Sequence, residues 1–74
     1  MAVTIEDIQT LVGLQLGLRR VSGQDRLMED LGAESADIVN IIATVEDKYR
    51  ISLAEADISR VRTVRDLYDL IEHT

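Results

Sequence analysis

The sequence predicts an all-α fold: a small four-helix bundle with three main helices and one short third helix. Its 74 residues leave room for one modest hydrophobic core. It has no proline, and 46% hydrophobic with 30% charged residues is typical of a folded helical domain. Apolar residues also recur at helical spacing in three segments. A single domain covering residues 1–74 is therefore expected.

The first predicted helix begins at Thr4, whose hydroxyl can accept a free backbone N–H. Asp7 follows three residues later, as in a capping box. Gly13 weakens the helix, and Gly17 is expected to end it just after Leu16. The apolar stripe of this helix consists of Ile5, Ile8, Leu11, Val12 and Leu16.

Residues 17–34 are predicted to form a long loop between the first and second helices. They contain three glycines, and their apolar residues follow no sustained period. A connection of this length is uncommon in a compact domain and usually has a function. The far end of the loop is therefore where a functional site is expected.

The second helix is predicted to start with Ser35 as its N-cap and to continue to Tyr49. The residues that share its inner face are Ile38, Ile41, Ile42, Val45 and Tyr49. Its outer face carries Ala36, Asn40, Ala43 and Asp47, with Val39 and Glu46 at the margin. This outer face is acidic and carries small apolar groups.

The last part of the chain predicts two more helices. Residues 54–60 form the short third one, with Ala56 and Ile58 as its anchors in the core. Thr63 and Asp66 repeat the capping pattern and begin the fourth. The inward stripe of this helix, which ends near Glu72, consists of Val64, Leu67, Leu70 and Ile71.

The net charge of −6 lies entirely in the middle of the sequence. Residues 25–47 contain seven acids and one base, whereas the rest of the chain has seven of each. This distribution favours a partner protein with a basic surface and argues against a nucleic acid. The other interpretation is an acidic surface that only keeps the protein in solution.

The composition also limits location and assembly. There is no cysteine, so disulfides and thiolate metal sites are not expected. No run approaches the roughly 18 apolar residues of a membrane span, and no signal segment is recognisable. We expect a cytoplasmic monomer.

The sequence offers no set of residues for catalysis. His73 is the only histidine and lies next to the end of the chain, where a solvated residue is the usual finding. No Ser-His-Asp or Cys-His arrangement and no metal-binding motif can be built around it. The expectation is a protein that is not an enzyme and has no metal site.

Ser35 is the one residue whose position suggests chemistry. A phosphate esterified to a serine in the first turn of a helix is stabilised by the exposed N–H groups and the helix dipole. However, serine is also a common N-cap. Taken by itself, the plain cap is the more frequent explanation.

Several segments resemble the acyl carrier protein family over nearly the whole chain. The attachment region of the family's prosthetic group is similar to Asp30-Leu31-Gly32-Ala33-Glu34-Ser35, followed by Asp37. The further segments that carry the resemblance are Gln15-Leu16-Gly17-Leu18, Glu29-Asp30-Leu31-Gly32-Ala33, Glu46-Asp47-Lys48-Tyr49 and Thr63-Val64-Arg65-Asp66-Leu67. A match of this length and order is far more specific than a short motif. It implies the acyl-carrier type of helical bundle.

The resemblance implies a function without a catalytic group. A phosphopantetheinyl transferase would move 4′-phosphopantetheine from coenzyme A onto Ser35, making a phosphoprotein whose thiol holds acyl groups as thioesters. Synthases and transferases of fatty-acid, lipid or polyketide biosynthesis would offer basic patches to the acidic surface. The residues that the resemblance assigns to partner recognition are Asp30, Glu34, Ala36, Asp37, Val39, Asn40, Ala43, Glu46 and Asp47.

The chain departs from the family around the serine. Glu34 replaces the usual aspartate and Ala36 the usual leucine, so an exposed apolar contact is lost. Asn40 and Ala43 stand where glutamate and methionine are usual, and the loop between the first two helices looks slightly shorter. These differences suggest a specialised carrier with its own partner enzymes.

Two alternatives remain open at the level of the sequence. A peptidyl, aryl or aminoacyl carrier shares the fold and the arm, although net acidity favours the acyl type. A helical interaction module without a prosthetic group is the alternative from a different class.

Overall fold

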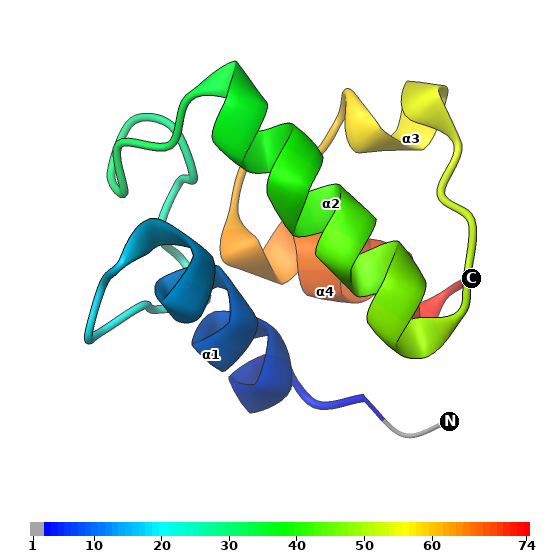
Figure 1. Cartoon of the computed structure of the whole chain (residues 1–74), viewed down its shortest axis with the longest axis horizontal. Helices are drawn as coiled ribbons and strands as arrows, with labels where there is room; N and C mark the ends of the chain where they lie inside the picture. Colours follow the sequence, from blue (N-terminus) through cyan, green and yellow to red (C-terminus); the bar gives the residue numbers. More distant parts are fainter. Residues whose placement is uncertain (1–2) are drawn as a thin grey trace.

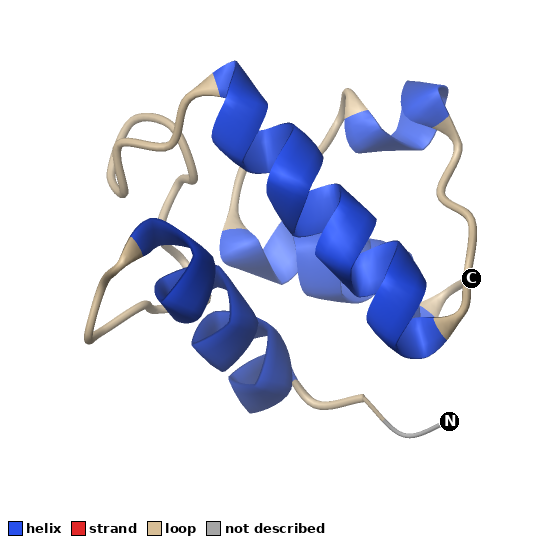
Figure 2. Ribbon diagram, viewed as in Figure 1, coloured by secondary structure: helices blue, strands red, loops and turns tan. Residues whose placement is uncertain are grey.

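The computed structural model describes residues 3–74. Its element order is α1 (Ile5–Leu16), α2 (Ser35–Tyr49), α3 (Glu55–Ile58) and α4 (Val64–Glu72), joined by loops (Figures 1 and 2). No strand occurs in this part of the chain. The predicted all-α fold with a short third helix is confirmed. None of these helices has the length and apolar character needed to cross a bilayer.

Local capping interactions fix where α1 and α4 begin. The Asp7 N–H donates to Thr4 Oγ1 at 3.1 Å, while the Thr4 N–H donates to the Asp7 carboxylate at 3.1 Å. Thr63 and Asp66 make the same reciprocal pair at the start of α4. Each pair satisfies donors that the first helical turn leaves without partners. Gly17 ends α1 as predicted, in the left-handed conformation with φ 70°.

The core lies where α1 packs against α2 and α4. All its members are hydrophobic, and aliphatic side chains dominate. The helices contribute Ile8, Leu11, Val12, Ile41, Ile42, Val45, Tyr49, Val64, Leu67 and Ile71 to it, and the loops contribute Leu27, Ala33 and Leu53. The predicted stripes are therefore confirmed, with their outermost members only partly buried.

The prediction for the third helix is only partly correct. The helix is a single turn, Glu55–Ile58, and none of its residues is fully buried. Ile58 packs against the core as expected, but Ala56 is exposed and was wrongly predicted as an anchor. One short turn can direct only one side of itself inward, and the longer isoleucine occupies that side.

The long loop of residues 17–34 is tied to the start of α4. Arg26 and Thr63 form an isolated antiparallel bridge. The Leu27 N–H donates to the Arg62 carbonyl at 2.8 Å, and the Val64 N–H donates to the Asp25 carbonyl at 3.1 Å. These main-chain bonds satisfy polar groups of a segment that has no regular structure of its own. They fix the part of the loop that leads to α2.

Candidate functional site

Ser35 is the first residue of α2, and it is exposed. The N-cap is Glu34, not Ser35 as predicted. Glu34 has the extended backbone that precedes a helix, φ −97° and ψ 171°, and its N–H donates to Asp37 Oδ2 at 2.9 Å. The carboxylate of Asp37 thus stabilises the helix start from inside the first turn. The Ser35 hydroxyl is not the cap of the helix.

A hollow of about 390 Å³ opens beside Ser35. Its wall is mainly apolar and comes from the loop before α2, from α2 itself, and from α3 with the residues that follow it. The residues that form it include Ser35, Leu27, Met28, Ile38, Ile58 and Val61. An elongated organic group attached at Ser35 can therefore lie against hydrocarbon without leaving the site.

A second hollow of about 290 Å³ lies between α2 and α3. Ile38 and Ile58 line both hollows, so the two hollows share part of their apolar lining. Both isoleucines are only partly buried. The shared lining therefore belongs to the partly buried edge of the core.

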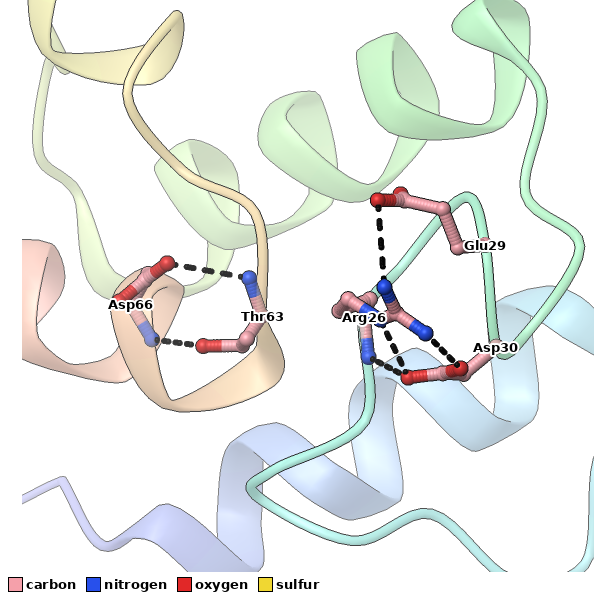
Figure 3. A network of polar contacts seen from close by, with 5 residues as sticks. All are labelled: Arg26, Glu29, Asp30, Thr63 and Asp66. Atoms are coloured by element: carbon pink, nitrogen blue, oxygen red, sulfur yellow. Dashed lines mark hydrogen bonds and ion pairs between the residues drawn. The ribbon is translucent and has the colours of Figure 1, made fainter.

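The turn before Ser35 is closed by an ion pair between Arg26 and Asp30 (Figure 3). Arg26 Nε donates to Asp30 Oδ2 at 3.0 Å, and Arg26 Nη2 donates to Asp30 Oδ1 at 3.0 Å. The Arg26 main-chain N–H adds a third bond to Asp30 Oδ2 at 2.8 Å. The side-chain hydrogen bond from Arg26 is the main reason why the pKa of Asp30 is lowered. Glu29 lies 3.9 Å from the same guanidinium.

The residues predicted for partner recognition divide into two groups. Those whose side chains are exposed on α2 and at its N-cap are Glu34, Ala36, Val39, Asn40, Ala43 and Asp47. Asp30, Asp37 and Glu46 instead engage their carboxylates within the chain, Glu46 by accepting the Leu53 N–H at 2.8 Å. The exposed group thus lies along α2 and at its N-cap, whereas Asp30 lies in the preceding turn, Asp37 in the first turn of α2 and Glu46 near its end.

Two residues near the serine were not singled out from the sequence. Met28 is 49% exposed and lines the hollow beside Ser35. Arg26 forms an ion pair with Asp30. The only sequence signal for this ion pair is that a basic and an acidic residue stand four positions apart. That signal applies to helices, whereas this segment is a loop of turns.

The site suits a phosphodiester that carries an extended arm. The exposed hydroxyl of Ser35 lies in the first turn of a 15-residue helix, where free N–H groups and the dipole favour a phosphate. The neighbouring hollow offers apolar contacts along the arm. Phosphopantetheine would supply a terminal thiol at the end of this arm. Within residues 3–74, no group of three or more potential ligands is arranged for a metal ion.

The chain is similar to known carriers over almost its whole length. Residues 6–71 match the family model described as phosphopantetheine attachment site. An acyl carrier protein of Helicobacter hepaticus is 31% identical over 71 residues, covering 93% of each chain. One from Phaeodactylum tricornutum is 30% identical over 67 residues, covering 88% of each. A solved structure assigned as an acyl carrier protein from Mycobacterium tuberculosis has a TM-score of 0.89 at 26% identity, covering 93% of this chain and 95% of that one.

A small helical bundle with a phosphopantetheine attachment region defines a carrier of thioester-bound groups. The chain belongs to the acyl carrier protein family. Its role is to carry acyl groups on 4′-phosphopantetheine. The family thus decides against an interaction module without a prosthetic group, and the relatives favour the acyl over the peptidyl or aminoacyl type. Carriers of this family interact with synthases and transferases.

Proposed function

We propose that Ser35 is the residue that carries the phosphopantetheine arm. The observation that supports this most is its position: an exposed serine in the first turn of α2, on the rim of the apolar hollow and inside the matched region. A phosphopantetheinyl transferase would transfer the arm from coenzyme A to Ser35. The serine oxygen forms a new P–O bond, giving a phosphodiester, while the pyrophosphate P–O bond of coenzyme A breaks; adenosine 3′,5′-bisphosphate leaves and the hydroxyl proton is released. The chain would then be the substrate of that enzyme, with residues 1–74 acting as one carrier domain.

The mass of the intact protein tests this attachment. After incubation with coenzyme A and a broad-specificity transferase, the wild type should gain the mass of one phosphopantetheinyl group. Ser35→Ala should gain nothing. Ser59→Ala is the matched control, because Ser59 is also exposed and lines the same hollow. An unchanged wild-type mass, or a modified Ser35→Ala, would overturn the proposal.

We further propose that partner enzymes dock on the exposed face of α2. The predicted recognition residues comprise the exposed group on α2 and its N-cap, together with Asp37 and Glu46 of α2 and Asp30 of the preceding turn. The net charge of −6 in residues 25–47 supports a basic counterpart on synthases and acyltransferases. The association should therefore weaken as salt is added.

The side chains on this face support a specialised carrier. Ala36, Asn40 and Ala43 are all exposed, and they are small or uncharged. A partner adapted to them would meet a flatter, less charged helix than the usual members of the family offer. A fatty-acid ketosynthase should accordingly use this carrier less efficiently than a general one. Equal kcat/KM values for the two carriers would contradict specialisation.

A further inference from the structure

We propose that Met28 is an apolar contact for the transferase that modifies Ser35, and that Arg26 is a positioning residue for Met28. This rests on the proposed attachment at Ser35. The recognition surface beside the serine would then include the turn of residues 26–33 as well as α2.

The exposure of Met28 is the first observation. A methionine is usually buried, yet this side chain is 49% exposed and lines the hollow on whose rim Ser35 lies. The residue directly after the serine, Ala36, offers an enzyme only a methyl group. Met28 is therefore a larger apolar side chain that an enzyme approaching the Ser35 hydroxyl can cover.

The geometry of the turn is the second observation. Met28 lies between Arg26 and Asp30, whose side chains meet in a two-pronged ion pair. The Arg26 carbonyl also accepts the N–H groups of Asp30 and Leu31, both at 3.0 Å. The Met28 carbonyl accepts the Gly32 N–H at 3.1 Å. The direction of the Met28 side chain thus depends on a turn that Arg26 closes.

The turn is anchored to the rest of the fold on both sides. Leu27 is buried, and its N–H donates to the Arg62 carbonyl at 2.8 Å. The Leu27 carbonyl accepts the Ala33 N–H at 2.9 Å, two residues before the serine. Because these bonds anchor the turn at both of its ends, the Arg26–Asp30 ion pair that closes it restricts the conformations of Met28 before an enzyme binds. Such preorganisation lowers the entropic cost of binding.

The charge around the turn indicates which occupant fits. Arg26 is the single base of residues 25–47, and it pairs with both Asp30 and Glu29, so this turn carries one negative charge in excess. Arg62, from the segment before α4, lines the same hollow as Met28, and the acidic excess of the site comes from residues 25–47 as a whole. A basic enzyme surface with an apolar pocket matches this pattern. In this arrangement Asp30 acts in recognition by holding the turn together with Arg26, which refines the contact role expected from the sequence.

The first test measures the KM and kcat of the transferase for wild-type and variant carriers, with the modification monitored by intact mass. Met28→Ala should raise the KM for the carrier about three- to tenfold with an unchanged kcat, because only a docking contact is removed. Leu14→Ala is the control, since Leu14 is 80% exposed but lies on α1. An unchanged KM in Met28→Ala, or an equal rise in Leu14→Ala, would overturn the contact.

The positioning role is tested by a double-mutant cycle. Arg26→Ala should raise KM by a similar factor, and Arg26→Lys should restore only part of it because lysine lacks the planar fork. In Met28→Ala/Arg26→Ala the two increases should not multiply, since Arg26 acts through Met28. Increases that multiply would overturn the positioning role. If the wild type is modified while Met28→Ala keeps its KM, only this inference fails; if the wild type is not modified, the attachment at Ser35 fails first.

Discussion

The main-chain N–H of Leu53 donates a hydrogen bond to Glu46 Oε2 at 2.8 Å, seven residues back along the chain. Glu46 lies near the end of α2, and Leu53 is a buried residue of the link to α3. The carboxylate therefore ties the link to the helix. Glu46 has a structural task in addition to the docking role proposed for it.

Glu46→Ala should lower the free energy of unfolding by about 1–2 kcal/mol, because it leaves a partly buried N–H without an acceptor. Glu46→Gln keeps an acceptor oxygen and should lose less. Asp47→Ala is the matched control, since Asp47 is exposed on the next position of the same helix. It should leave denaturant unfolding unchanged while weakening binding to a basic partner. Equal stability of Glu46→Ala and Asp47→Ala would contradict the structural task.

Arg50→Gly should stabilise the protein by about 0.5–1 kcal/mol. Arg50 ends α2 in the left-handed conformation, φ 55° and ψ 51°, where a Cβ is unfavourable and glycine is not. Arg50→Ala removes the same charge but keeps the Cβ, so it should give no such gain. Thermal unfolding of the two variants checks this. A melting temperature of Arg50→Ala equal to or above that of Arg50→Gly would contradict the conformational strain at this position.

Gly13→Ala should destabilise the protein by about 1–3 kcal/mol despite the better helix propensity of alanine. Gly13 is buried in α1, and an added Cβ would lie 2.9 Å from the Leu18 carbonyl oxygen, where the chain folds back after Gly17. The backbone would have to move. Thr10→Ala, an exposed position of the same helix, serves as the control. If urea unfolding showed Gly13→Ala to be more stable than the wild type, the backbone at Leu18 would have to shift at little cost in free energy, which would contradict this prediction.

Acid should destabilise the fold through Asp66 and Asp30. The pKa of Asp66 is lowered, first by its hydrogen bond from the Thr63 N–H, and that of Asp30 first by the Arg26 side chain. Their stabilisation is fully present above the ordinary value of 3.8 and is lost as the pH falls through the lowered folded-state pKa values. Melting temperatures should thus drop below about pH 4.

Asp66→Asn should already be less stable at neutral pH and should show a shallower decline in acid, because it cannot titrate. Glu55→Gln, at an exposed position of α3, controls for the loss of one acid. If the Asp66→Asn curve runs parallel to that of the wild type below pH 4, the cap carboxylate is not the titrating group.

The extent of α1, α2 and α4 could be predicted from the sequence because their signals are local. A threonine with an aspartate three residues later marks the start of α1 and of α4, and Gly17 marks the end of α1. The apolar spacing of α2 identified the side that carries Ile41 and Val45 as the core face. These interactions join residues within one or two helical turns, so they need no knowledge of the rest of the fold.

Long-range packing decided what the sequence alone left open or predicted wrongly. Glu34 rather than Ser35 caps α2, because the anchored loop delivers Glu34 in an extended conformation. Ile58 faces the core and Ala56 does not. Likewise, Met28 and Ser35 line one hollow together with Ile58 and Val61, which lie far along the chain, and the Leu27 N–H is bonded to the Arg62 carbonyl of that distant segment. Composition and spacing carry local preferences, whereas contacts between distant segments exist only once the core has formed.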